Sequence, residues 1–292
     1  MKILITGSKG QLGSEIGELS VHYKKFDFTF TDIDELDITN YNALTKYFKK
    51  NKFDTIINCA AFTAVDKAET EKENASLLNK IAVKYLAEFA AINNSLFVHV
   101  STDYVFDGRS CKPYSETDIT NPKSFYGKSK LDGEVEVIFQ SKKAIIIRTS
   151  WLYSSYGHNF VKTILKAAKE KGELKVVSDQ VGTPTYARDL AKTILDILPF
   201  YNTENKFEIF NYSNEGVTSW YDFAKEITEI ANIKCSITPI ESKEYPTPAM
   251  RPFYSVLNKS KIKKQFKLVI PHWKDSLKEC IKKINEDKKN NQ

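Results

Sequence analysis

The stretch that decides the fold is residues 2–13, KILITGSKGQLG, at the start of the sequence. Its first five residues read as a short apolar strand. Gly7, Gly10 and Gly13 follow at three-residue spacing, and a helix is predicted from Gln11. A strand, a glycine turn and a helix in this order form the context that a dinucleotide-binding fingerprint requires. The glycines let backbone amides approach a pyrophosphate, and the helix N-terminus adds partial positive charge. A loop of three permissive turn residues is the alternative, and the position directly after a strand disfavours it.

The second strand brings an acidic residue to the same edge of the predicted sheet. Residues 26–31 alternate in polarity and end at Asp32, which is 19 positions past Gly13. An acid near this place is expected to hydrogen-bond the adenosine ribose and to repel a 2′-phosphate, which favours NAD over NADP. A simple polar turn over 32–34 is an equally good interpretation, and the sequence leaves both open.

Strands and helices keep alternating through the first half of the chain. Apolar strands are predicted at 53–61, 95–101 and 144–148, with helices at 40–50 and 74–93 and another that opens at Tyr126. This rhythm predicts an α/β fold built on a doubly wound, Rossmann-like parallel sheet.

The character of the chain changes after residue 150. Helices are predicted at 160–171, 187–198 and 220–233 and strands at 174–178 and 236–240, and a strand at 207–211 is expected to join the main sheet. We therefore expect a dinucleotide-binding domain over 1–150 and a smaller C-terminal substrate-binding domain over 151–292, with a cleft between them.

Three polar side chains are expected to converge at the carboxyl edge of the sheet. The strand at 95–101 leads directly into Thr102, and the helix that follows carries Tyr126 and Lys130 four residues apart, hence on one face. A phenol has an ordinary pKa of about 10, and a neighbouring ammonium lowers that pKa. Such a phenol can protonate an oxygen as hydride reaches the adjoining carbon. A Tyr-x-x-x-Lys pair alone is more often a solvated helix face, so the upstream hydroxyl and glycines carry the hypothesis.

Composition limits the classes of function. Of the 292 residues, 41% are hydrophobic and 27% charged, an ordinary globular balance. No apolar run approaches the roughly 20 residues of a membrane span, and the chain opens on a strand rather than a signal peptide, so we expect a cytoplasmic protein with no membrane partner. The four cysteines are far apart, which argues against zinc and disulfide frameworks. The net charge of +6 comes largely from C-terminal lysines that lack interleaved aromatics, which favours a solvated helix over a nucleic-acid surface.

Five further motifs carry a family resemblance. They are STDYVFDG at 101–108, AVDKAE at 64–69, RTSW at 148–151, GTPT at 182–185 and RP at 251–252. With them the chain resembles the extended short-chain dehydrogenase/reductases over nearly its whole length. Within them it resembles the branch that reduces the C4 ketone of a dTDP-linked 4-keto-6-deoxy sugar to form dTDP-L-rhamnose. The resemblance implies a nucleotide-sugar substrate and NADH or NADPH as the cofactor.

The resemblance also implies roles for particular residues. Tyr126 would donate the proton, Lys130 would lower its pKa and bind the nicotinamide ribose, and Thr102 would hydrogen-bond the substrate oxygen. Asp103 and Trp151 would lie against the substrate. The cofactor would be lined by Gly10, Gln11, Leu12, Asp32, Asp37, Ile38, Ala61, Phe62 and Thr63, in addition to Gly7 of the glycine turn.

The proline-rich segment at 245–252 offers a cation for the substrate diphosphate. Its prolines stiffen the chain around Arg251, which limits the entropy lost on ordering, and a guanidinium can meet phosphate oxygens in a fork. A salt bridge that only ties this segment to a neighbouring helix is the alternative.

Metal binding is doubtful on the sequence. Some members of the resembled family form dimers bridged by magnesium through glutamates, and Glu15 matches the first such position. Arg188 falls at the second and is not a metal ligand. We therefore expect no metal site, and the sequence leaves a monomer and a homodimer both open.

Two other functions remain compatible with the same fold. One is a nucleotide-sugar epimerase or dehydratase, although a dehydratase needs an extra carboxylate near the strand end and Tyr104, not glutamate, follows Asp103. The other is a non-catalytic regulatory subunit that senses NAD(P)H, since fold alone does not define function. The presence of Thr102, Tyr126 and Lys130 together favours catalysis.

Overall fold

A computed structural model describes residues 1–201 and 207–290 and is organised around a six-stranded parallel sheet. The strand order is β10-β5-β4-β3-β1-β2. The strands are β1 (Lys2–Thr6), β2 (Asp27–Thr31), β3 (Thr55–Asn58), β4 (Leu96–Thr102), β5 (Ala144–Thr149) and β10 (Phe207–Asn211). The chain passes from β1 outward to β2 and then back across to β3, so the direction of winding reverses between β1 and β3. In open α/β sheets, ligands bind outside the carboxyl ends of the strands at this switch point.

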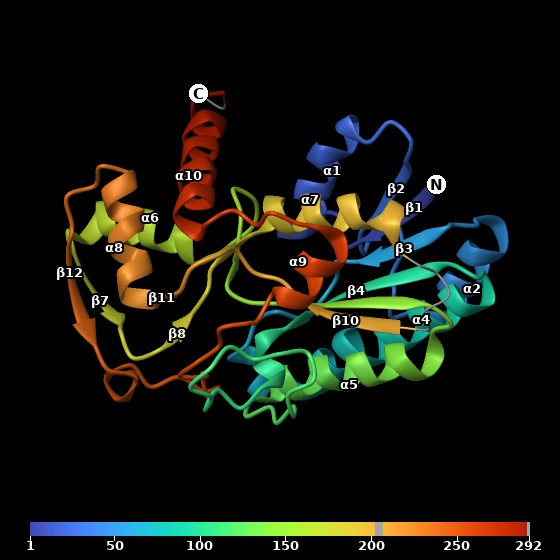
Figure 1. Cartoon of the computed structure of the whole chain (residues 1–292), viewed down its shortest axis with the longest axis horizontal. Coiled ribbons are helices and arrows are strands. Elements are labelled where there is room, and N and C mark those ends of the chain that lie inside the picture. Colours follow the sequence, from blue (N-terminus) through green and yellow to red (C-terminus); the bar gives the residue numbers. More distant parts are fainter. Residues whose placement is uncertain (202–206, 291–292) are drawn as a thin grey trace.

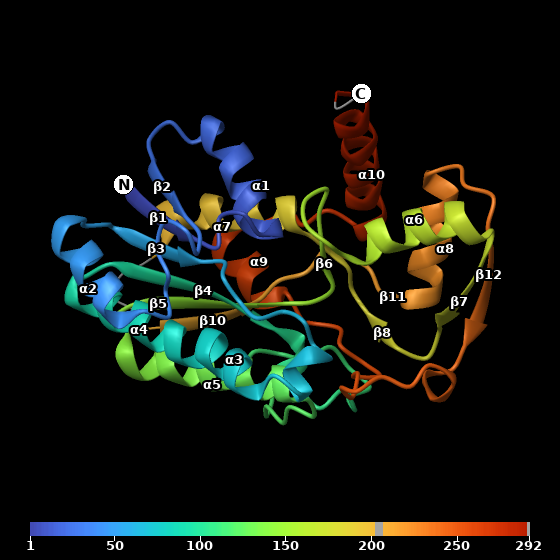
Figure 2. The same ribbon diagram turned by 180° about the vertical axis from the view of Figure 1, so that it is seen from behind.

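Helices cover both faces of the sheet, which confirms the predicted doubly wound fold (Figures 1 and 2). One face carries α1 (Gln11–Leu19), α7 (Ala187–Ile197) and α9 (Ser260–Phe266). The other carries α2 (Tyr41–Lys50), α4 (Ala82–Ile92) and α5 (Phe125–Gln140). Alternate residues of β1 serve the two layers, because Ile3 and Ile5 pack with the first set of helices and Leu4 with the second. A strand that is buried on both faces reads as a continuous apolar run.

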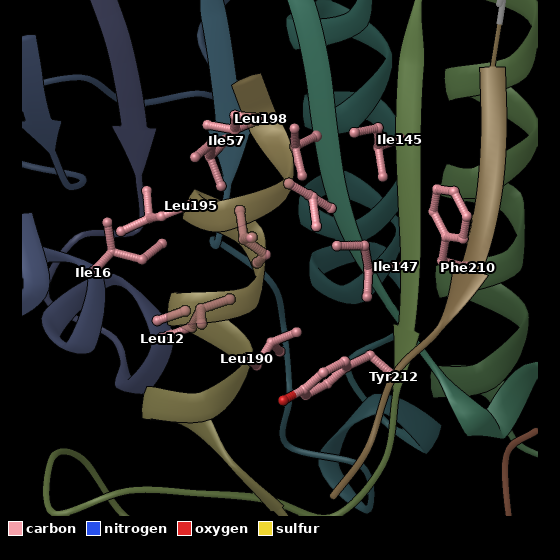
Figure 3. Close-up of a cluster of buried hydrophobic side chains, with 14 of the residues drawn as sticks. Leu12, Ile16, Ile57, Ile145, Ile147, Leu190, Leu195, Leu198, Phe210 and Tyr212 are labelled. Atoms are coloured by element: carbon pink, nitrogen blue, oxygen red, sulfur yellow. The ribbon is translucent and has the colours of Figure 1, made fainter. Parts of the chain in front are cut away.

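More segments from the second half of the chain pack with the main sheet than the sequence indicates. The strand at 207–211 is confirmed as β10, which pairs in parallel with β5. In addition, α7 lies on the sheet beside α1, and its Leu190 and Leu195 belong to one apolar cluster with Ile16 of α1 and Ile147 of β5 (Figure 3). Thus α7, β10 and α9 lie with the large sheet although they follow residue 150.

A smaller layered unit stands beside the sheet (Figures 1 and 2). It contains α6 (Phe160–Lys171), α8 (Trp220–Ile230), the parallel pair β7 (Glu173–Val177) and β12 (Ser236–Ile240), and α10 (Trp273–Asn290). Its core includes Tyr153, Phe223 and Leu277. Two short pairs connect it to the sheet: β6 (Leu152–Tyr153) with β9 (Thr185–Tyr186), and β8 (Val181–Gly182) with β11 (Thr218–Ser219).

The remaining helical segments are short. They are η1 (Ser20–His22), η2 (Lys67–Glu69), α3 (Lys72–Ser76), the π-helical η3 (Leu77–Ile81), η4 (Asp103–Val105), η5 (Leu198–Phe200) and η6 (Ser242–Glu244). The helix predicted at 74–93 is therefore α3, η3 and α4 in succession.

Two sequence expectations differ from the structure in detail. The strand predicted at 53–61 ends at Asn58, because residues 59–61 leave the sheet to line a groove. The C-terminal lysines are not all solvated, since Lys259 is buried and Lys283 pairs with Glu15 and Glu18 on α1. Among the described residues, no helix combines the length and the apolar character that a membrane span requires.

Candidate active site

A groove of about 720 Å³ opens at the switch point, outside the carboxyl ends of β1, β2 and β3. Seven predicted cofactor residues line it: Gly7, Gly10, Asp32, Asp37, Ile38, Ala61 and Phe62. Three others lie elsewhere. The Leu12 side chain packs in the core beneath the sheet, Gln11 accepts a hydrogen bond from Asn159, and Thr63 is exposed on the following loop.

The glycine turn shapes the floor of this groove. Gly7 adopts a φ of +67°, and a Cβ there would lie 2.6 Å from the backbone nitrogen of Ala60. A Cβ on Gly13 would lie 2.4 Å from the Gly7 carbonyl oxygen, so α1 approaches the turn too closely for any side chain. No side chain caps the N-terminus of α1 at Gly10. Its first amides therefore remain available to an anion such as a pyrophosphate.

Asp32 combines the two interpretations that the sequence left open. Its carboxylate lines the groove, yet it also accepts hydrogen bonds from the backbone amides of Lys9 (2.9 Å) and Ile33 (2.9 Å), as a turn residue does. The exposed ammonium of Lys9, another residue of the groove lining, forms ion pairs with Asp34 and Glu35. An acid and a cation thus lie together in the lining of the groove.

Thr102 and Tyr126 meet at the carboxyl edge of β4. The Thr102 hydroxyl donates to Asp103 Oδ1 at 3.0 Å and accepts from the Tyr104 amide. Burial raises the pKa of Tyr126 to about 12, opposed by a hydrogen bond with the Thr102 side chain. Gly127 lets the start of α5 lie directly against η4, because a Cβ on Gly127 would lie 2.3 Å from the Tyr104 carbonyl oxygen.

Lys130 lies below Tyr126 on the same helix but makes other contacts. Its Nζ donates to the Val100 carbonyl oxygen at 2.7 Å and lies 3.5 Å from Nε2 of His99. Burial lowers the pKa of Lys130 to about 8. Burial is the largest cause of both pKa shifts, and the expected lowering of the Tyr126 pKa by Lys130 stays a prediction.

Asp103 is the most costly polar residue of the site. It is 2% exposed, and its Oδ2 has no hydrogen-bond partner within the described residues. Burial raises the pKa of Asp103 to about 6, although hydrogen bonds to the carboxylate oppose the shift. An acceptor of this kind is held ready for a ligand hydroxyl or for a proton.

Arg251 combines a salt bridge with an unused donor. Its Nη2 lies 2.7 Å from Asp66 Oδ2, so the pairing expected as the alternative exists, although Asp66 lies on the loop before η2 rather than on a helix. Its Nη1 is buried and has no partner among the described residues. Arg251 lines a small pocket with Tyr104 and Ser124, and the Tyr104 ring packs edge-on against Tyr126. One nitrogen therefore ties the segment down, while the other is a buried donor without a partner among the described residues.

Asn79 is a site residue that the sequence did not indicate. It is fully buried in the π-helical turn η3. Its Oδ1 accepts a hydrogen bond from the backbone N–H of Phe62 at 2.8 Å, and its Nδ2 donates one to the backbone carbonyl oxygen of Phe62 at 3.0 Å. Nδ2 also donates to Ser129 on α5. One asparagine thus connects the groove wall to the helix of Tyr126. The available signal was an amide within the helix predicted at 74–93.

Glu15 is satisfied by protein groups. It is fully buried, accepts from Ser154 at 2.5 Å, and lies 3.2 Å from both Arg188 and Lys283. Two cations and a hydroxyl therefore interact with the carboxylate of Glu15, the residue that matches a metal-ligand position of the resembled family. Across residues 1–201 and 207–290, no group of three or more histidine, cysteine or acidic side chains is arranged to hold a metal ion.

Comparisons with known proteins agree on one family. The family model described as the RmlD substrate binding domain matches residues 1–286. A dTDP-4-dehydrorhamnose reductase from Aggregatibacter actinomycetemcomitans is 42% identical over 95% of this chain and 97% of its own length. The crystal structure of a dTDP-4-dehydrorhamnose reductase from Clostridium acetobutylicum aligns with a TM-score of 0.92 at 44% identity, covering 98% of this chain and all of that one. A Bacillus anthracis dTDP-4-dehydrorhamnose reductase, solved in complex with NADP, has a TM-score of 0.91 at 35% identity and covers 97% and 99% of the two chains.

Proposed function

The chain belongs to the RmlD substrate-binding-domain family, and from that premise we propose that it reduces the C4 ketone of dTDP-4-dehydro-L-rhamnose to give dTDP-L-rhamnose. The observation that carries the proposal is the meeting of Thr102 and Tyr126 beside a groove lined by the glycine turn. Relatives named for this reaction match nearly the whole chain, which supports the same chemistry here.

The groove fits a dinucleotide for two reasons. Its glycines leave the backbone of the turn uncovered by side chains, and no side chain caps the N-terminus of α1. A reduced nicotinamide, when bound, supplies the hydride to C4. Thr102 orients the ketone oxygen by a hydrogen bond once its hydroxyl turns away from Asp103. Tyr126 then transfers its phenolic proton to that oxygen as negative charge develops. Lys130 lies one turn further along the same helix, and its ammonium would bind the nicotinamide ribose when the cofactor is present and lower the pKa of Tyr126.

We infer that both NADH and NADPH serve as the reductant. Asp32 favours a free 2′-hydroxyl, but its carboxylate is already held by backbone amides. Lys9 supplies a nearby cation for a 2′-phosphate, and the Bacillus anthracis relative binds NADP. Measured kcat/KM values within about tenfold of each other would agree with this balance. A preference above about a hundredfold for either cofactor would show that one of the two charges prevails.

We infer that the diphosphate of the substrate binds at Arg251 and that the sugar lies between Thr102 and Trp151. The support is the buried, unpartnered Nη1 of Arg251 in a pocket beside Tyr104. The segments after residue 150 that lie outside the six-stranded sheet would then bind the substrate, next to the carboxyl end of β4.

The test of the function is a reduction assay with purified protein, dTDP-4-dehydro-L-rhamnose and NADPH or NADH. We expect loss of nicotinamide absorbance in step with the formation of dTDP-L-rhamnose. An epimerase or dehydratase would instead retain NAD through gel filtration and change the sugar without net cofactor oxidation. A regulatory subunit would bind the cofactor and show no turnover with any dTDP-4-keto sugar.

A further inference from the structure

Trp151 is held in an unusual backbone conformation. Its φ is +47°, in the left-handed region that bulky side chains rarely adopt. Such strain persists only where the surroundings hold the residue in place, and it gathers at ligand sites. Trp151 lies two residues beyond Thr149, the register partner of Thr102 across β4 and β5. The strained indole therefore belongs to the same edge of the sheet as the reacting group.

Two neighbours fix the indole of Trp151. The ring of Trp220 stacks on it with centroids 3.5 Å apart and planes 7° from parallel. Gly182 packs on it so closely that a Cβ would lie 2.7 and 2.8 Å from Cε2 and Cζ2 of the indole. The backbone is fixed as well, because the Trp151 carbonyl oxygen accepts from Thr185 at 3.1 Å.

Trp220 is itself firmly placed. It is the first residue of α8, directly after Ser219, whose hydroxyl caps the helix by accepting from Asp222 at 3.0 Å. The ring of Phe160 packs against Trp220 with centroids 4.6 Å apart. The smaller unit of the molecule thus presents Trp220 as a rigid support for a residue that leaves the end of β5.

We propose that Trp220 is a positioning residue for the sugar site: it holds the indole of Trp151 at the edge of the sheet that carries Thr102, and the stacked pair thereby sets the fit of the 6-deoxyhexose ring. This inference rests on the proposed function. A deoxyhexose exposes C–H groups and a methyl group, which an indole contacts as an apolar surface. A stacked aromatic pair shifts an equilibrium by roughly 2- to 12-fold. Loss of Trp220 therefore releases a strained Trp151 into other conformations.

Trp273 provides a matched control. It belongs to the same buried cluster, where its ring packs edge-on against Phe223. Trp273→Leu therefore removes an indole from the same core, whereas Trp220→Leu removes the indole that stacks on Trp151. Trp220→Phe keeps an aromatic ring at the position and serves as the rescue variant.

The experiment measures steady-state reduction together with circular dichroism of the unliganded proteins. We expect Trp220→Leu to raise KM for dTDP-4-dehydro-L-rhamnose about 5- to 10-fold, with kcat at saturation and KM for NADPH changed by less than about twofold. The exciton couplet of the stacked indoles should disappear. Trp273→Leu should keep both the couplet and the sugar KM, and Trp220→Phe should recover most of the sugar KM although its couplet is lost.

The outcomes separate the two proposals. A wild-type protein that does not reduce this sugar overturns the proposed function and, with it, the sugar site inferred here. A wild-type protein that is active, with a Trp220→Leu variant of unchanged sugar KM, overturns only the role of Trp220. An equal rise in sugar KM for Trp273→Leu also overturns that role, because it would show that any loss from the aromatic core has the same effect.

Discussion

At the scale of single residues, the site depends on groups that are buried at a cost. Tyr126 lies with a raised pKa beside Thr102, and its hydroxyl is the only part of the side chain that the proposed chemistry consumes. Tyr126→Phe removes that proton and little volume. We expect the fold and NADPH affinity to be unchanged and kcat to fall about 10²–10⁴-fold, the usual contribution of general acid catalysis. Retention of more than about a third of kcat, where chemistry limits turnover, would rule out Tyr126 as the acid.

Asp103 allows a pH prediction at the same scale. Its pKa rises from 3.8 to about 6 on folding, so between those pH values the folded state binds more protons than the unfolded state. Stability therefore falls as pH rises through this window, and the full cost, roughly 3 kcal/mol, is present above pH 6. Asp103→Asn should be more stable than the wild type at pH 7 and about equal to it at pH 4. Denaturant unfolding at both pH values measures this, and an equal difference at the two would contradict it.

At the scale of elements, η3 shows what a local sequence pattern misses. The helix predicted at 74–93 is present, but the widened turn that directs Asn79 at Phe62 depends on contacts with a distant loop and with α5. Asn79→Ala leaves the amide and the carbonyl of the half-buried Phe62 without this partner, and a fully buried group left unpaired costs about 1–3 kcal/mol. We expect a lower thermal midpoint and a several-fold higher Kd for NADPH. Asn93→Ala, which removes a bond to a carbonyl at the end of α4, is the control and should leave the NADPH Kd unchanged.

The same distinction explains how far the sequence reaches. Local signals predict the strands of the sheet, the glycine turn and the Tyr126 helix, because apolar periodicity and turn residues encode them directly. The packing of α7 on the sheet was not predicted, since the sequence of an amphipathic helix does not indicate which surface its apolar face covers (Figure 3). The pairing of Glu15 with Arg188 and Lys283 and the stacking of Trp151 on Trp220 join residues that are far apart in the sequence, and one chain carries no record of such pairs.

At the scale of the whole molecule, the contact between Asp66 and the proline-rich segment spans the reacting edge. Asp66 comes from the loop after β3, and it receives Arg251 Nη2 on one oxygen and the Ala249 amide on the other. The Arg251–Asp66 pair is partly exposed, so its contribution to stability is about 1 kcal/mol or less. If the unpartnered Nη1 of Arg251 binds the diphosphate, the two nitrogens of one guanidinium have separate tasks.

Arg251→Lys keeps a charge for Asp66 but loses the fork. We therefore expect KM for the nucleotide sugar to rise about tenfold, with NADPH KM and the thermal midpoint nearly unchanged. Asp66→Asn is the complementary variant, which should lower the midpoint slightly and leave Arg251 able to meet phosphate. A stability loss in Arg251→Lys with both KM values unchanged would instead make Arg251 a structural tie, and the diphosphate would have to be held by another group.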